Sequence, residues 1–180
     1  LAIDEESEEA GVNSTEPTVL PAIEVPQQLS PLEEALEEAR KIAYTNSDEA
    51  VARYWDAINI GDDSGIAFCE LSRLYYNRTQ FNEAEMTSLE ALRRGPANNR
   101  YLLTYLHIIR KTKPKPEVVS EIRKYRHLYP KNPDLVLLLA RIYAEPSGDV
   151  MSARTLYDLF FQMAPNHPDI ERAKYEARGI

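Results

Sequence analysis

The chain has 180 residues, of which 43% are hydrophobic and 28% charged, proportions typical of a globular protein with a continuous core. Its net charge of −8 at pH 7 argues against a nucleic-acid-binding protein, which normally carries a basic excess. The single cysteine, Cys69, excludes an internal disulfide framework and any multi-cysteine metal site. No apolar run approaches the roughly 20 residues that a membrane helix needs, so we expect no direct membrane insertion.

The negative charge is concentrated at the N-terminus. Residues 1–30 contain seven acidic residues and no Lys or Arg, whereas residues 31–180 contain 22 acidic and 21 basic residues. Pro21 and Pro26 interrupt the apolar second half of this segment and disfavour a helix. We therefore expect residues 1–30 to form an extended or disordered leader. The alternative is that its apolar half docks on the folded part in extended form.

Helical signals begin at Ser30. The sequence Ser30-Pro31-Leu32-Glu33 has the form of a capping box with proline at the first helical position. From there to the C-terminus, apolar spacing predicts alternating helices of about 11–15 residues joined by short connections. The apolar run at 135–140 could be a strand, but Asn132-Pro133 is a helix start and the helical stripe continues beyond the run.

Three segments share a self-similar ending, in which a proline ends one helix and an Asn or Pro starts the next. The first prolines of these segments are Pro96, Pro130 and Pro165, spaced 34 and then 35 residues apart. A period of 34 is the length of a tetratricopeptide repeat, a helix–turn–helix unit.

The internal pattern of residues 64–98 resembles the tetratricopeptide family best. The matching positions are Phe68, Leu71, Ser72 and Tyr75 for the family's Trp, Leu, Gly and Tyr, and Ala84, Ala91 and Pro96 for its small, small and Pro positions. Ser72 replaces the usual glycine and Ser88 replaces the usual aromatic residue. The expected units are a degenerate helix pair at 31–63, repeats at 64–98, 99–132 and 133–167, and a capping helix at 168–180.

The resemblance implies an all-α fold, a right-handed α–α superhelix of three to four helix pairs with a C-terminal capping helix. Stacking the pairs would bury one continuous core, because a single pair cannot cover both of its faces. The first helix of each pair would then line a concave groove, and residues one place after each core position would face that groove.

The candidate groove residues carry many cations and few acids. They are Arg73, Tyr76, Asn77, Arg100, Leu103, His107, Arg110, Lys111, Leu137 and Arg141, with Cys69 beside them and Leu36, Arg40 and Tyr44 added by the first unit. Because arginine forks suit carboxylates, we expect the groove to bind an acidic peptide. The alternative is a solvated face in which these arginines pair with Glu70, Glu90 or Asp134.

Two more specific forms of recognition can be judged from the sequence. Cys69, Arg73 and Thr104 stand where the family's carboxylate-clamp members have a set of Lys and Asn residues, so a chaperone-type C-terminal motif is not the expected ligand. The acidic leader is an internal candidate ligand, since a short flexible link gives an effective concentration on the order of mM.

Signals for catalysis or cofactor binding are poor. Cys69 and His107 could pair as a nucleophile, but the sequence supplies no third orienting group and no oxyanion site. No spacing of His, Cys or carboxylates resembles a metal site, and there is no glycine-rich phosphate loop. We therefore expect no enzymatic activity, no metal and no cofactor.

The sequence thus predicts a protein-interaction module, an adaptor or assembly scaffold that binds a peptide segment in its groove. The alternative is a structural solenoid that self-associates or forms part of a larger chain, which exposed Phe160, Phe161 and Met163 would support. The Pro-rich acidic leader and the non-Met start resemble a spacer after a removed signal or anchor, which slightly favours an extracytoplasmic (periplasmic or membrane-tethered) setting over the cytoplasm.

Overall fold

The computed structural model describes residues 29–146 and 148–180, so the predicted leader lies outside the described residues except for its last two positions. The described part is all-α, with nine helices and no strand. The helices are α1 (Pro31–Ala43), α2 (Ser47–Gly61), α3 (Ile66–Asn77), α4 (Phe81–Arg94), α5 (Asn99–Thr112), α6 (Lys115–Leu128), α7 (Pro133–Tyr143), α8 (Val150–Met163) and α9 (Ile170–Arg178).

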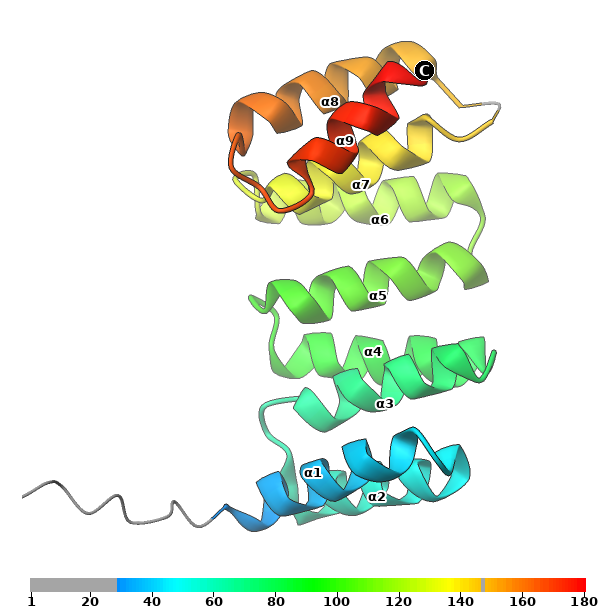
Figure 1. Ribbon diagram of the computed structural model, residues 1–180, viewed down its shortest axis with the longest axis vertical. Helices are drawn as coiled ribbons and strands as arrows, with labels where there is room; N and C mark the ends of the chain where they lie inside the picture. Colours follow the sequence, from blue (N-terminus) through cyan, green and yellow to red (C-terminus); the bar gives the residue numbers. More distant parts are fainter. Residues whose placement is uncertain (1–28, 147) are drawn as a thin grey trace, which may run out of the picture.

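The helices are stacked in chain order into an elongated array, with α1 and α2 at one end and α7 to α9 at the other (Figure 1). Each helix packs on its neighbours in the sequence, most extensively α3 on α4, α1 on α2 and α7 on α8. The packing of α5 on α6 is much less extensive. Val118, Ile122 and Tyr125 are bulky side chains on α6 at places where the repeat usually has smaller residues, and bulky side chains hold two helix backbones further apart.

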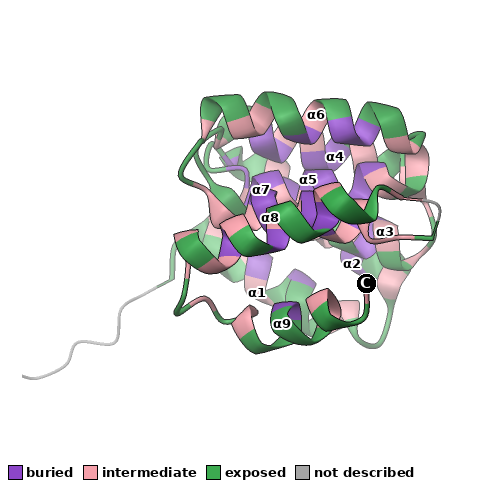
Figure 2. Cartoon of the chain, turned by 90° about the horizontal axis from the view of Figure 1, so that it is seen from above, coloured by how far each residue is buried: buried purple, intermediate pink, exposed green. Residues whose placement is uncertain are grey.

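The core runs along the whole array. Its central part joins α3 to α7, and two further clusters fill the ends, one between α1 and α4 with Ile108 of α5, the other among α7, α8 and α9. Leu71, Leu102, Leu106, Val136 and Leu139 are each at most 2% exposed. Viewed along the array, buried residues face neighbouring helices, while the outer side of α6 is exposed (Figure 2). The predicted continuous stack is therefore an α-solenoid.

Helix starts follow the predicted caps. The Ser30 hydroxyl accepts the Glu33 backbone N–H at 3.2 Å, and the Glu33 carboxylate accepts the Ser30 backbone N–H at 2.8 Å, which completes the capping box. The side chains of Asn98 and Asn132 accept backbone N–H groups at the starts of α5 and α7. Helices α1, α5 and α7 thereby begin at the residues that the sequence signals identify.

The three self-similar segments are joined in space by a ladder of side-chain hydrogen bonds. The Asn132 amide donates to the Asn99 carbonyl oxygen at 2.6 Å, and the Asn99 amide donates to the Asp134 carboxylate at 2.7 Å. His167 Nε2 lies 3.0 Å from the other oxygen of Asp134. The repeated polar residues therefore fix the spacing between units as well as starting the helices.

The start of α3, which carries part of the candidate groove, is fixed by a buried carboxylate. Asp62 is 0% exposed and accepts the backbone N–H groups of Gly65 at 3.0 Å and Ala67 at 2.7 Å, and the Ser64 hydroxyl at 2.6 Å. Gly65 adopts φ +80°, and a Cβ there would lie 2.9 Å from the Ala91 carbonyl oxygen. The turn before α3 is therefore held against α4 with little freedom.

Replacing Asp62 by Ala should destabilise the array. The substitution leaves buried N–H groups of Gly65 and Ala67 without acceptors, and each such loss costs about 1–3 kcal/mol. For the two groups together we expect the free energy of unfolding, measured by urea denaturation, to fall by about 2–6 kcal/mol. Asp63→Ala is the matched control, because Asp63 is exposed and should change stability by less than about 0.5 kcal/mol. Equal stability of the two variants would contradict the capping role.

Candidate functional site

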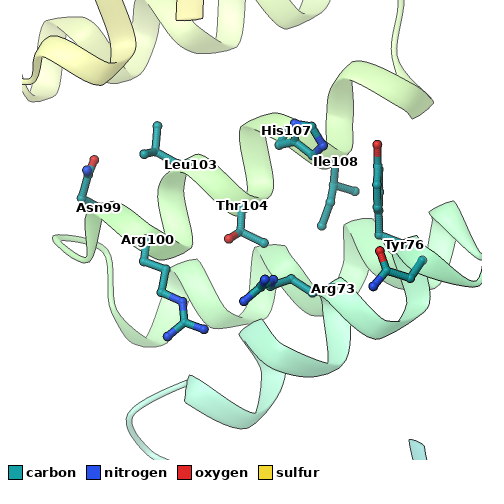
Figure 3. A pocket seen from close by; sticks show the side chains of 9 residues that line it. Arg73, Tyr76, Asn99, Arg100, Leu103, Thr104, His107 and Ile108 are labelled. Carbon is teal, nitrogen blue, oxygen red and sulfur yellow. The ribbon is translucent and has the colours of Figure 1, made fainter. Parts of the chain in front are cut away.

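Two adjoining hollows lie on the face formed by α1, α3 and α5. The first has a volume of about 580 Å³ and is lined by Arg73, Tyr76, Asn77, Asn99, Arg100, Leu103, Thr104, His107 and Ile108 (Figure 3). The second, of about 340 Å³, is lined by Arg40, Ala43, Tyr44, Tyr54, Glu70, Arg73, Leu74, Asn77 and Arg100. Because they share Arg73, Asn77 and Arg100, we treat the two hollows as one groove.

One end of the groove is aromatic and apolar. The rings of Tyr76 and His107 lie 5.1 Å apart between centroids, and Phe81 packs edge-on against Tyr76 at 5.5 Å. Partial burial, followed by the nearby charges of Arg110 and Lys111, lowers the pKa of His107 below its usual value. His107 is therefore neutral at neutral pH, and this end of the groove presents an uncharged surface.

The other end is cationic. Arg40 binds both oxygens of Glu70 at 2.8 Å, the Tyr54 hydroxyl donates to Glu70 at 3.3 Å, and Arg100 reaches Glu70 at 3.8 Å. Within the part of the chain that the structure describes, Arg73 makes no ion pair and no side-chain hydrogen bond. Three arginines thus face one carboxylate, and the groove keeps an excess of positive charge.

Arg110 and Lys111 lie apart from this groove. Arg110 donates to Glu145 at 2.8 Å, and Lys115 approaches the same carboxylate at 3.5 Å. These residues surround a small separate hollow of about 70 Å³ between α5, α6 and α7. Lys111 is exposed and lines neither hollow of the groove.

Helix α9 covers the α7 end of the predicted groove. Arg141 donates to Glu176 at 2.8 Å and lies 3.1 Å from Asp169, while Leu137 is 2% exposed in the cluster that contains Ala173 of α9. The expectation that Leu137 and Arg141 line a groove is therefore corrected. Ala173 of α9 packs in the same cluster as Leu137, and Asp169 and Glu176 pair with Arg141. These side chains therefore occupy the surface where the sequence predicted a bound ligand.

Seven residues that line the groove were not assigned to it from the sequence. They are Asn99, Thr104 and Ile108 in the first hollow, and Ala43, Tyr54, Glu70 and Leu74 in the second. The sequence analysis assigned to the groove only the residue that directly follows each core position. On α5 this choice gives one row of side chains and omits the rows on either side of it. Thr104 lies four residues after Arg100, so helical spacing could have placed it on the same face. Tyr54 was missed because it lies on a second helix, α2, whereas the sequence rule considers only first helices.

Cys69 is buried rather than facing the groove. The side chain is 0% exposed, with its sulfur 3.8 Å from the Thr104 hydroxyl. Burial raises the pKa of the thiol, so it stays protonated at neutral pH, and it forms no pair with His107. Within residues 29–146 and 148–180, no group of three or more His, Cys, Asp or Glu could hold a metal ion, and no helix could span a membrane.

The C-terminal apolar patch that would favour self-association is not exposed. Phe160 is 0% exposed, and Phe161 and Met163 are partly buried against the same cluster. Ile170 and Ala173 of α9 pack on this cluster and cover it.

Comparison with solved structures supports the fold. The chain is similar to the crystal structure of YrrB, described as a TPR protein with an unusual peptide-binding site. The match has a TM-score of 0.55 and 18% sequence identity, and covers 79% of this chain and 72% of that chain. No protein-family model and no curated protein sequence matches the chain. The fold is thus a tetratricopeptide-like α-solenoid, as the sequence predicted.

Proposed function

We propose that this protein is a peptide-binding adaptor or assembly scaffold, and that its groove over α1, α3 and α5 holds an acidic segment of a partner protein. The observation that carries the proposal is Arg73, an arginine without an ion-pair partner among the described residues, beside a hollow of about 580 Å³ that no acidic residue lines. The peptide-binding site named for YrrB, which has the same fold, supports a protein or peptide ligand.

The groove suits an acidic ligand in shape and in charge. The volumes of the two hollows, about 580 and 340 Å³, both lie within the range of about 300–1,000 Å³ that is typical of ligand pockets. Together the hollows accommodate a short peptide segment. A guanidinium group binds a carboxylate through paired, charge-assisted hydrogen bonds. An acidic side chain would lie near Arg73 and Arg100, with a neighbouring apolar side chain against Tyr76, Leu103 and His107.

Reversing the charge of the groove should abolish partner capture. In the double variant Arg73→Glu/Arg100→Glu, both cations become anions that repel an acidic ligand, and a juxtaposition of like charges costs on the order of several kcal/mol, which is more than about tenfold in affinity. We expect its partners to be depleted at least tenfold in pull-downs from source lysate, quantified by mass spectrometry, with helicity by circular dichroism unchanged.

The matched control is Lys131→Glu/Arg178→Glu, which changes the net charge equally at two exposed residues outside the groove. This control should capture the same partners as the wild-type chain. If both double variants retain the wild-type partners, the groove is not the binding site. Arg110 and Arg141 are unsuitable targets, because charge reversal there would break ion pairs to Glu145 and Glu176 within the array.

We also propose that the acidic leader competes for the groove in cis. Residues 1–30 carry seven acidic residues and no base, which complements the excess of arginine in the groove. A tethered segment of this length reaches an effective concentration on the order of mM, so weak binding suffices to screen the groove until a partner displaces it.

Deleting residues 1–28 should change the NMR chemical shifts of Arg73, Arg100 and His107. A synthetic peptide of residues 1–28 added in trans should restore the shifts. A version with Glu5, Glu6, Glu8 and Glu9 changed to Gln should fail to restore them, because it loses most of the leader's charge. Identical shifts along the groove in the intact and shortened chains would refute binding in cis.

A further inference from the structure

The two ends of the array share the same three-residue cluster. At the N-terminal end, Arg40 and Tyr54 hold Glu70, which comes from the next first helix, α3. At the C-terminal end, Arg141 donates to Glu176 of α9 at 2.8 Å, and the Tyr157 hydroxyl donates to the same carboxylate at 3.2 Å. In each case an arginine from a first helix and a tyrosine from a second helix bind one glutamate from the helix that follows.

The arginines and tyrosines of these clusters occupy equivalent places in the repeat. Arg40, Arg73, His107 and Arg141 follow one another at intervals of 33, 34 and 34 residues along the first helices. Tyr54, Ser88, Ile122 and Tyr157 follow one another at 34, 34 and 35 residues along the second helices. The repeat period itself therefore predicts where a cluster of this kind would form in each unit.

In the second unit, the arginine is present but its two partners are replaced. Ser88 stands 34 residues after Tyr54, and its hydroxyl instead donates to the Glu85 carbonyl at 3.0 Å. Thr104 stands 34 residues after Glu70, and its hydroxyl lies beside the Cys69 sulfur. Arg73 consequently has neither the phenol nor the carboxylate that Arg40 and Arg141 have.

The larger hollow of the groove lies where these two substitutions occur. Arg73 and Thr104 both line it, and their side chains extend into the space between α3 and α5, with Arg100 nearby on α5 (Figure 3). Arg73 is exposed, so water can solvate its guanidinium when no ligand is bound. A carboxylate from a ligand can therefore bind there and leave reversibly, whereas at the array ends the carboxylate is part of the protein itself.

We infer that this hollow is a carboxylate-binding site in which a ligand carboxylate takes the place that Glu70 and Glu176 take at the two ends of the array. The inference rests on the proposed peptide-binding function and specifies the group that is recognised. The carboxylate pairs with Arg73 and lies within reach of Arg100, and the apolar side chain next to it packs on Leu103, Tyr76 and His107. An Asp or Glu side chain and a peptide C-terminus supply the same chemistry.

A substitution that places a carboxylate of the protein itself beside Arg73 should prevent a ligand carboxylate from binding there. Thr104→Glu restores the acidic residue at the position equivalent to Glu70, where it pairs with Arg73 and excludes a ligand. Thr104→Gln is the matched control, since it has the same size without the charge. The probes are nine-residue N-acetylated peptides on an array, and each contains one Asp or Glu beside Leu, Phe or Tyr. In a matching control peptide, Asn or Gln replaces the acidic residue. Every peptide is made with a free and with an amidated C-terminus.

The best-binding peptide is then titrated by fluorescence anisotropy. The wild-type chain should bind it at least tenfold more tightly than its amide counterpart. Thr104→Glu should bind it at least tenfold more weakly than wild type, and also more weakly than Thr104→Gln, because Gln adds the same bulk to the hollow without the charge. The unfolding midpoint of Thr104→Glu should be unchanged or raised, because the new carboxylate is paired. Comparison of free and amidated C-termini identifies which carboxylate is bound.

Three results would overturn the inference: equal affinity of Thr104→Glu and wild type, equal binding of acidic and amide peptides, or no binding by any peptide of the array. A fall of more than about 5 °C in the unfolding midpoint of Thr104→Glu would also contradict the pairing with Arg73. If Arg73→Glu/Arg100→Glu loses its partners while Thr104→Glu keeps them, the carboxylate site is refuted and the proposed peptide-binding function stands.

Discussion

The burial of α5 and α7 between neighbouring helix pairs is the constraint on which the rest of the array depends. A single helix pair cannot cover both of its faces, so α5 turns Leu102, Leu106 and Ile109 inward and packs them against α4, α6 and α7. The helical period then leaves a second stripe on the same helix, which includes Arg100, Thr104 and His107, on the open face. The position of the groove therefore follows from the packing of the core. The residues on the open face of α5 can change without loss of the fold, as long as the buried residues are kept.

Charge is used differently at the ends of the array and in its middle. At the ends, Arg40 of α1 is bound to Glu70 of α3 and Arg141 of α7 to Glu176 of α9, so these ion pairs join each helix pair to the helix that follows it. In the middle, Arg73 has no such partner among the described residues, and Arg100 reaches Glu70 only at 3.8 Å. Exposed ion pairs contribute little to stability, so the loss of one in the middle costs the fold little. The same loss leaves a cation that can recognise a partner.

Most of the fold could be predicted from the sequence, because the signals that set it are local or periodic. Pro96, Pro130 and Pro165 mark the unit boundaries, and Ser30 starts the first helix with the expected cap. The candidate groove was predicted only in part. Its α3 and α5 residues come together, but the covering of Leu137 and Arg141 depends on the direction in which α9 folds back, which no local pattern encodes. The burial of Cys69 and Phe160 is likewise decided by packing between helices that are distant in the sequence.

Site-specific photo-crosslinking tests the central claim, that the groove is where this protein holds its partner. A photoreactive amino acid at Leu103, in the groove, is compared with one at Met86, which is 73% exposed and lines neither hollow of the groove. Both variants are irradiated in source lysate, and the crosslinked peptides are sequenced by mass spectrometry. The account predicts one acidic partner segment crosslinked at Leu103 and absent at Met86. The same partner segment crosslinked equally at both positions, or at Met86 alone, would contradict it.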